Sequence, residues 1–366
     1  MYDYLIVGSG LAGAVFAFEA TKRGKKCLVL ERRNHFGGNV YCDNIEGINV
    51  HKYGAHIFHS NNEKIWNYVN EITRFNNFVN SPIARYKDEV YNLPFNMNTF
   101  SKMWGIFSPK EAIEIIDRQK QKITSKPENL EEQAISLVGT DIYEKLIKGY
   151  TEKQWGRACI DLPVFIINRI PVRFTYDNNY YDMKFQGIPQ GGYNCLFDKF
   201  FKNCEIVLEK DYICNRENYN SLAKKVLYTG NIDTFYDYCF GELQYRSLRF
   251  EHKVYNIANY QGVAVVNYTD NNIPYTRSIE HKHFESSNNK KTVVSYEYPL
   301  EWSKDIEAYY PVNDEKNQKK YHQYESLAQK EKNVIFCGRL AQYKYLNMSD
   351  TIEEALKKVE KEFSNN

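Results

Sequence analysis

The chain has 366 residues, of which 43% are hydrophobic and 26% charged, and its formal net charge is +2. This balance gives no reason to expect nucleic acid or an acidic membrane as a partner, and no apolar run approaches the roughly 20 residues that span a bilayer. The length predicts two or three subdomains, and the first residues lack a signal-peptide pattern, so we expect a cytoplasmic protein.

The chain opens with a β-α-β unit. Residues 2–7 read as an apolar strand, residues 8–13 (GSGLAG) as a glycine turn, the following residues as a helix to about Arg23, and residues 27–30 as a second strand. The turn matches GxGxxG in the context that this motif requires, directly after a strand and opening a helix. The unit therefore predicts a dinucleotide site.

Each element of this motif has a physical role. Gly8 permits the tight turn, Gly10 lets the backbone approach a pyrophosphate, and Gly13 lets the helix pack on the strand. Glu31, at the end of the second strand, is placed to accept hydrogen bonds from ribose hydroxyls. The motif alone does not separate NAD from FAD.

Three further segments favour a flavin. A glycine pair at residues 37–38 follows the acidic residue, and residues 190–192 and 336–340 resemble flavoprotein segments that return to the cofactor. In the last of these, Arg339 would neutralise the pyrophosphate, although a solvated surface arginine is the alternative interpretation.

The middle of the chain reads first as helices and then as strands. We predict helices from Pro109, over 130–138 and over 141–148, and strands over 262–268, 291–296 and 333–337, with a closing helix from about Thr351. The polar stretch 313–320 reads as a loose loop, and the eight cysteines, which lack zinc-like spacing, as reduced thiols with no metal site.

These elements predict an α/β fold with a discontinuous Rossmann-like FAD-binding domain, an inserted helical subdomain and an antiparallel β-sheet subdomain. The expected limits are 1–65, 183–245 and 312–366 for the FAD-binding domain, 97–165 for the helical substrate subdomain, and 66–96, 166–182 and 246–311 for the sheet subdomain.

Six segments, spread over the whole chain, resemble one family in their order and spacing. They are HKYGAHIFH at 51–59, YTEKQWG at 150–156, RIPVRF at 169–174, YTRSIEHKH at 275–283, YYP at 309–311 and GRLAQYKYL at 338–346. The chain resembles the bacterial UDP-galactopyranose mutases, which interconvert UDP-galactopyranose and UDP-galactofuranose for cell-surface glycan biosynthesis.

The resemblance implies an isomerase in which N5 of reduced FAD acts as the nucleophile. In the family the flavin attacks the anomeric carbon and displaces UDP, the sugar ring opens and recloses, and UDP returns. There is no net redox change, yet the flavin must first be reduced, by an external reductant such as NAD(P)H. The family also favours homodimers.

The resemblance implies the following site residues. Arg169 and Arg277 clamp the diphosphate, with Arg169 in a segment that closes over the substrate; Tyr150 stacks on uracil and Trp155 lines the sugar pocket. His56 lies at the N5 edge of the flavin and His59 faces the sugar, whereas a structural histidine is the alternative for each, and His-x-x-His lacks the further ligands of a zinc site. The other substrate-binding residues are Asn80, Tyr180, Tyr309, Tyr345 and Asn347, and the cofactor-binding residues are Gly8, Gly10, Leu11, Gly13, Glu31, Arg32, Gly38, Asn39, His56, Ile57, Arg246, Gly338 and Arg339.

Tyr150 and Trp155 are five residues apart, so on an unbroken helix they would not share a face, and we expect a loop or helix end near Gly149 or Gly156.

Two departures from the family bear on specificity. Asn347 replaces a common aspartate and Asn168 a commonly basic residue, and both are candidates for tuning the sugar, for example towards UDP-N-acetylgalactosamine.

Two other function classes stay open from the residues. One is an FAD-dependent oxidoreductase of the amine-oxidase type, which shares the dinucleotide fold but has no need of a diphosphate clamp. The other is a catalytically silent protein that binds a nucleotide.

Overall fold

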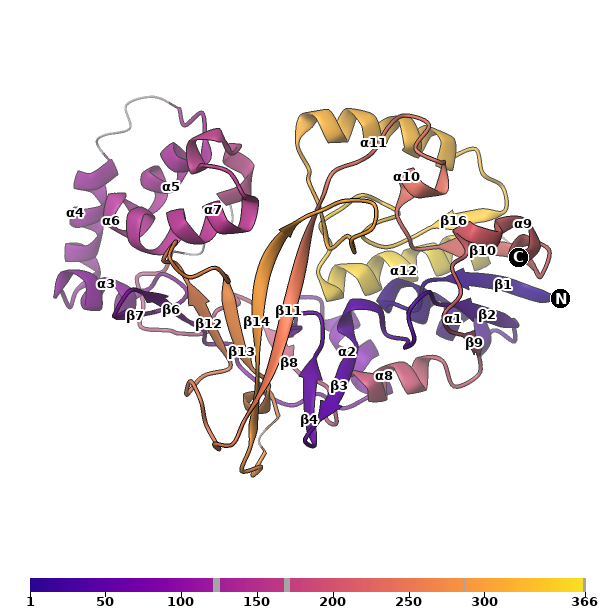
Figure 1. The fold of residues 1–366 in the computed structure, drawn as a ribbon, viewed down its shortest axis with the longest axis horizontal. Coiled ribbons are helices and arrows are strands. Elements are labelled where there is room, and N and C mark those ends of the chain that lie inside the picture. Colours follow the sequence, from indigo (N-terminus) through magenta and orange to yellow (C-terminus); the bar gives the residue numbers. More distant parts are fainter. Residues whose placement is uncertain (121–125, 168–171, 286, 365–366) are drawn as a thin grey trace.

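The computed structural model describes residues 1–120, 126–167, 172–285 and 287–364. A five-stranded parallel sheet forms the half of the molecule that carries both termini (Figure 1). Its strand order is β16-β10-β1-β2-β9, with bounds Val334–Phe336, Ala223–Tyr228, Tyr2–Val7, Cys27–Leu30 and Glu205–Val207. The sheet thus joins segments from the beginning, the middle and the end of the chain.

Both faces of this sheet are covered, which explains why its central strands are mostly apolar, as in the fully buried β2. On one face, Ile6 of β1 packs with residues of α1 (Leu11–Lys22), α8 (Tyr193–Phe200) and α12 (Met348–Phe363). On the other face, Leu5 packs with residues that include Phe235 of α10 (Ile232–Phe235) and Tyr324 of α11 (Glu315–Ala328).

A seven-stranded sheet stands beside it, with long strands that dominate the centre of Figure 1. Its order is β15-β11-β14-β13-β12-β6-β7, with bounds Tyr310–Pro311, Tyr245–Tyr255, Thr292–Glu301, Arg277–Glu280, Val265–Tyr268, Ile83–Tyr86 and Glu89–Asn92. All neighbours are antiparallel except β12 and β6, which pair in parallel. The smaller elements of the chain are β3 (Cys42–Ile45), β4 (Ile48–His51), β5 (Phe58–Ser60), β8 (Phe185–Gly187), α2 (Glu63–Ile72) and α9 (Arg216–Asn220), with 3₁₀ turns at Gly38–Val40, Cys159–Asp161, Val164–Ile167, Ile213–Asn215 and His281–His283.

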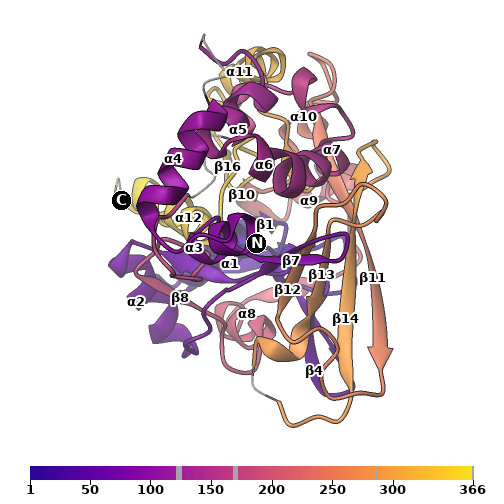
Figure 2. The same cartoon turned by 90° about the vertical axis from the view of Figure 1, so that its left-hand side faces the viewer.

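A helical group packs at the far end of the seven-stranded sheet (Figures 1 and 2). It has its own apolar core, in which Phe100, Ile116, Leu130 and Tyr143 are fully buried. The helices are α3 (Met97–Trp104), α4 (Pro109–Lys120), α5 (Leu130–Val138), α6 (Thr140–Ile142), a π-helical segment (Tyr143–Lys148) and α7 (Gly149–Trp155). Asn96 and Asn129 cap α3 and α5 through their side chains, as their residue type favours.

The structure confirms the predicted fold class. It differs from the predicted secondary structure in two segments. Residues 315–320, predicted as a loose loop, form the first turns of α11, which Asp314 caps by accepting a hydrogen bond from the backbone N–H of Asn317 at 2.8 Å. The helix predicted over 141–148 is largely π-helical and continues into α7. Of the two expected helix ends, Gly149 and Gly156, the chain has the one at Gly156 (φ +67°). The domain limits given above stay a prediction. Within the described ranges, no helix is both long enough and apolar enough to cross a bilayer.

A chain of buried histidines fastens the loop after β4 to the seven-stranded sheet. The backbone N–H of His56 donates to Nδ1 of His51 at 3.1 Å, and the backbone N–H of His51 donates to Nδ1 of His281 at 3.1 Å. Because Nδ1 accepts in both rings, each carries its proton on Nε2. Nε2 of His281 then donates to Oγ of Ser295 at 2.5 Å, and that hydroxyl donates to Nδ1 of His252 at 2.6 Å. The loop before His56 is therefore held by neutral imidazoles.

We predict that this chain makes the protein acid-sensitive. Burial lowers the pKa of His51 to about 3 and that of His281 well below its usual value. Between pH 6.5 and 5 the unfolded chain binds protons at both rings and the folded chain does not, so the free energy of unfolding should fall on acidification, by up to about 1.4 kcal/mol per pH unit for each ring.

Urea unfolding at pH 7, 6.5, 6 and 5 measures this slope. His281→Gln, which keeps a hydrogen-bonding side chain but cannot take up a proton, should lose up to one ring's share of the slope. The matched control is His322→Gln, whose side chain lies on the exposed face of α11 and whose replacement should leave the slope unchanged. An identical slope in wild type and His281→Gln would contradict the prediction.

Candidate active site

A cavity of about 400 Å³ opens at the carboxyl ends of the parallel strands. The segments after all five strands line it: Gly8 and Gly10 after β1, Glu31–Arg33 after β2, residues 210–214 after β9, residues 228–231 at the end of β10, and residues 338–340 after β16. Ligands of open α/β sheets bind in this place, where the chain leaves the strands.

Glycines bring the backbone close to the cavity. Gly38 has φ +57°, and a Cβ there would lie 2.8 Å from Cα of Gly10, so the two main chains touch without side chains between them. Gly10 itself has ordinary angles, and a Cβ there would meet nothing nearer than 3.9 Å. It precedes α1, whose first turn has no side-chain cap. Free N–H groups at a helix N-terminus attract phosphate.

Glu31 is bonded to the glycine turn. Its Oε2 accepts from the backbone N–H and Oγ of Ser9 at 3.0 and 2.6 Å, and its Oε1 accepts from the backbone N–H of Arg33 at 3.0 Å. The carboxylate therefore fixes the turn against the end of β2 while it borders the cavity.

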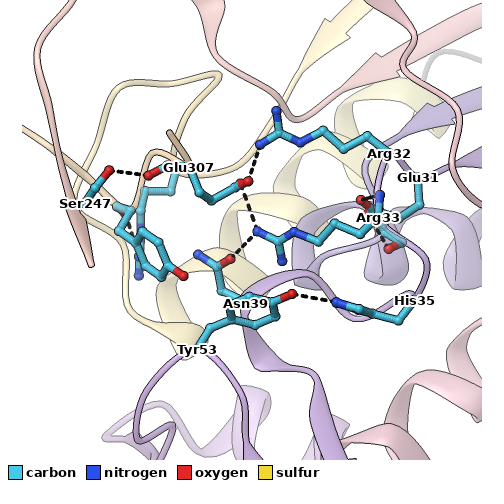
Figure 3. Close-up of polar contacts among 11 residues, drawn as sticks. Glu31, Arg32, Arg33, His35, Asn39, Tyr53, Ser247 and Glu307 are labelled. Carbon is cyan, nitrogen blue, oxygen red and sulfur yellow. Dashed lines mark hydrogen bonds and ion pairs between the residues drawn. The ribbon is translucent and has the colours of Figure 1, made fainter. Parts of the chain in front are cut away.

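Two arginines converge on one carboxylate beside the cavity (Figure 3). Glu307 accepts from Arg32 at 2.5 Å and lies 2.8 Å from Arg33. Arg33 also donates to Oδ1 of Asn39 at 2.8 Å, and its guanidinium lies 4.4 Å from the ring centre of Tyr53. Its Nη1 is buried and has no hydrogen-bond partner among the described residues. Arg33 was not predicted as a cofactor-binding residue, yet it has a buried hydrogen-bond donor that no described residue satisfies.

Most of the predicted cofactor residues meet at this cavity. Those that line it are Gly8, Gly10, Leu11, Glu31, Arg32, Gly38, Asn39, His56, Gly338 and Arg339. Three do not. A Cβ at Gly13 would lie 2.1 Å from O of Gly8, so this glycine serves helix packing; Ile57 is in the apolar core; and Arg246 donates to O of Gln154 at 2.7 and 3.1 Å.

A second group of side chains surrounds Arg277 on β13. Its guanidinium forks onto Glu297 of β14, the residue directly opposite in the sheet, with Nε and Nη2 2.8–3.0 Å from the carboxylate oxygens. Glu297 is only 2% exposed. Burial opposes the charge of Arg277, but Glu297 and the neighbouring groups outweigh it, and the pKa stays well above its usual value. The site thus holds a permanent cation.

Tyrosines ring this cation. Burial raises the pKa of Tyr150, Tyr180, Tyr181 and Tyr310, and the positive charge of Arg277 partly offsets the rise in each. Tyr150 and Tyr180 were predicted as site residues, and Tyr181 and Tyr310 were not. These four tyrosines, together with Arg277, Glu297 and Tyr345, are called the Arg277 group below.

The YYP segment divides its two tyrosines between the two groups. Tyr310 stacks on Tyr345, with ring centres 5.5 Å apart, and lies by Arg277, whereas Tyr309 is buried, lines the cofactor cavity and lies by Arg33. Tyr309 therefore borders the cofactor cavity, and its predicted hydrogen bond to the diphosphate stays a prediction. Successive residues of an extended chain point to opposite sides, but the sequence pattern does not tell which of the two tyrosines faces which site.

His56 lies between the two groups. It lines the cavity, and burial with the charges of Arg339 and Arg277 lowers its pKa to about 4. Its Nδ1 donates to O of Gly54 at 2.8 Å, so the neutral ring offers Nε2 as an acceptor. His59 likewise donates from Nδ1 to O of Ile57 at 2.9 Å and stacks on Tyr181, with ring centres 3.8 Å apart. Burial also lowers the pKa of His59.

The remaining predicted residues lie as follows. Trp155 packs against the core of the helical group, and Asn80 is buried with its Oδ1 unpartnered among the described residues. Asn347 caps α12, where its Oδ1 accepts from the backbone N–H of Asp350 at 2.9 Å, a role that asparagine and aspartate fill equally well. Arg339 donates to O of Leu346 and to O of Tyr309, and lies 5.3 Å from the ring centre of Tyr310. Arg169 and Asn168 lie outside the described residues.

Comparison with known proteins places this geometry in a family. A family model described as UDP-galactopyranose mutase matches residues 145–345, more than half of the chain, and one described as NAD(P)-binding Rossmann-like domain matches residues 6–72. The solved structure of a reduced UDP-galactopyranose mutase matches with a TM-score of 0.75 at 13% identity, over 100% of this chain and 94% of the other, and supports the fold.

Two curated relatives match along all or nearly all of their length. A dTDP-fucopyranose mutase from Escherichia coli is 39% identical over 375 residues, covering 100% of both chains. A probable UDP-galactopyranose mutase from Klebsiella pneumoniae is 40% identical over 362 residues, covering 97% of this chain and 93% of the relative. Since the family model and these relatives agree, the chain belongs to the UDP-galactopyranose mutase family of isomerases.

Proposed function

We propose that the protein interconverts UDP-galactopyranose and UDP-galactofuranose, with FAD in the cavity at the parallel sheet and the nucleotide sugar at the Arg277 group. The observation that carries the proposal is the forked Arg277–Glu297 pair, surrounded by tyrosines and adjoining the cavity through His56. Guanidinium and phenol groups suit diphosphate oxygens. An amine substrate, by contrast, would meet a partly buried cation.

The residues around the cavity fit FAD. The approach of Gly10 and Gly38 leaves backbone free for a pyrophosphate, and Nη1 of Arg33 is a buried donor without a partner among the described residues. Reduced flavin supplies a nucleophilic nitrogen for displacement at an anomeric carbon. We propose that an external reductant such as NAD(P)H keeps it reduced, and that the working unit is a homodimer.

In this proposal the protein's own residues hold charge and orient the substrate. Arg277 neutralises the diphosphate as the bond to the sugar breaks, and Glu297 keeps the guanidinium forked and aimed. The hydroxyls of Tyr180, Tyr310 and Tyr345 donate to the diphosphate oxygens. His56 stays neutral at pH 7, so its Nε2 accepts a hydrogen bond at the flavin edge without adding positive charge there.

A second candidate substrate is dTDP-fucopyranose, because the E. coli relative that bears this name is 39% identical along the full length of both chains. The two sugar nucleotides differ in the base, the 2′-hydroxyl of the ribose and the 6-hydroxyl of the sugar. Either one presents the diphosphate to Arg277.

The test supplies dithionite-reduced protein with UDP-galactose or dTDP-fucose and follows furanose formation by chromatography. We expect conversion of UDP-galactose without consumption of oxidant, with a kcat/KM above that for dTDP-fucose. A higher value for dTDP-fucose would move the assignment to the second candidate. Turnover only with oxidised flavin and oxygen would overturn both, as would binding of UDP without any conversion.

Arg277→Lys should lower kcat/KM by roughly 10- to 100-fold, because lysine keeps the charge that Glu297 needs but loses the fork, and a charge-assisted contact to phosphate is worth about 1.5–3 kcal/mol. The matched control is Arg249→Lys, an exposed arginine on β11 of the same sheet. Activity within twofold of wild type would remove Arg277 from the diphosphate site.

Gly10→Val should abolish flavin retention but leave the apoprotein folded. The first side-chain atom at this position has space in the structure, so any loss is expected to come from the blocked approach to the pyrophosphate. Visible absorption and the thermal midpoint of the apoprotein measure the two effects. A variant that purifies with full flavin occupancy would contradict this placement of the cofactor.

A further inference from the structure

Lys153 holds together two elements of the Arg277 group. Its ammonium lies within hydrogen-bond distance of four backbone carbonyls on the turn between β12 and β13: those of Tyr268 and Asp270 at 2.8 Å, Ile273 at 3.0 Å and Tyr275 at 3.2 Å. Three ammonium protons are thus shared among four acceptors that converge on one point.

Other contacts show how closely α7 sits on this turn. A Cβ at Gly149, the first residue of α7, would lie 2.3 Å from O of Thr269, so only glycine allows the approach. At the other end of α7, the guanidinium of Arg246 donates twice to O of Gln154. The helix is therefore fixed at both ends, with Lys153 between them.

The two clamped elements carry opposite sides of the site. Tyr150 is the second residue of α7, and Arg277 follows the turn directly, two residues after Tyr275. α7 packs against β14, the strand that pairs with β13 at Arg277, and the charge of Arg277 partly offsets the rise that burial causes in the pKa of Tyr150.

We propose that Lys153 is a positioning residue that sets the spacing between Tyr150 on α7 and the guanidinium of Arg277, and so adapts the site to a nucleoside diphosphate. The inference rests on the proposed function, in which the diphosphate lies against Arg277, and on the expectation from the family resemblance that the base stacks on Tyr150. A ligand that touches both sides gains affinity from a preset spacing, whereas one that touches a single side does not.

The experiment compares Lys153→Met with Lys153→Arg and wild type, all loaded with FAD. Lys148→Met is the matched control, since Lys148 lies five residues earlier and pairs at the surface with Glu144 at 3.3 Å. Calorimetric titration measures the Kd of UDP and of uridine, and steady-state assays measure KM and kcat.

We expect Lys153→Met to weaken UDP binding about tenfold or more and to raise KM by a similar factor. The Kd of uridine, kcat at saturation and the visible spectrum of the flavin should change less than threefold. Lys153→Arg keeps the charge, but its planar guanidinium does not match four converging carbonyls, so its UDP affinity should lie between those of wild type and Lys153→Met. If Lys153→Met does not fold, Lys153→Arg carries the comparison.

Three outcomes are informative. UDP affinity within twofold of wild type in a folded Lys153 variant overturns the inference and leaves the proposed function standing. Equal weakening of UDP and uridine, or loss of flavin, assigns Lys153 a general structural role and also overturns it. A wild-type protein that does not bind UDP overturns the proposed function itself, and this inference with it.

Discussion

The forked ion pair between Arg277 and Glu297 is the constraint on which the site depends. The two residues lie opposite each other on neighbouring strands, and Glu297 is almost completely buried, so each charge requires the other. Leaving one of them unpaired would cost about 3–5 kcal/mol. The pair therefore keeps a guanidinium with a set orientation inside the protein, where its charge acts on four tyrosines and on His56.

The architecture sets this cation beside a cofactor cavity. The carboxyl ends of the parallel strands and their glycine turns form most of the cavity, the seven-stranded sheet carries Arg277, and α7 packs against β14 of that sheet. His56 and Arg339 lie where the two meet, and the buried histidine chain fastens the loop that carries His56. A nucleotide sugar bound at Arg277 would in this way reach the flavin edge.

The sequence predicted the parts that depend on local pattern. The glycine turn, Glu31, the strand bounds 2–7 and 27–30, and the helix over 130–138 follow from spacing and hydrophobic periodicity, and the structure has them. It did not predict which way neighbouring residues face. Tyr310 and Arg33 were missed, because only the tertiary fold decides which way each of two adjacent side chains faces. The start of α11 was missed because its exposed face is polar. Lys153 was missed because its partners are backbone carbonyls of a distant segment, which no local sequence pattern indicates.

Flavin and uridine diphosphate are proposed to occupy adjoining parts of one site. Titration of UDP into the flavin-loaded protein, followed by visible absorption in the oxidised and dithionite-reduced states, measures whether they do. We expect a saturable change in the flavin spectrum, because the diphosphate at Arg277 alters the charge beside the flavin edge. A yellow protein that binds UDP with no spectral change would contradict it, as would a protein that cannot be loaded with flavin.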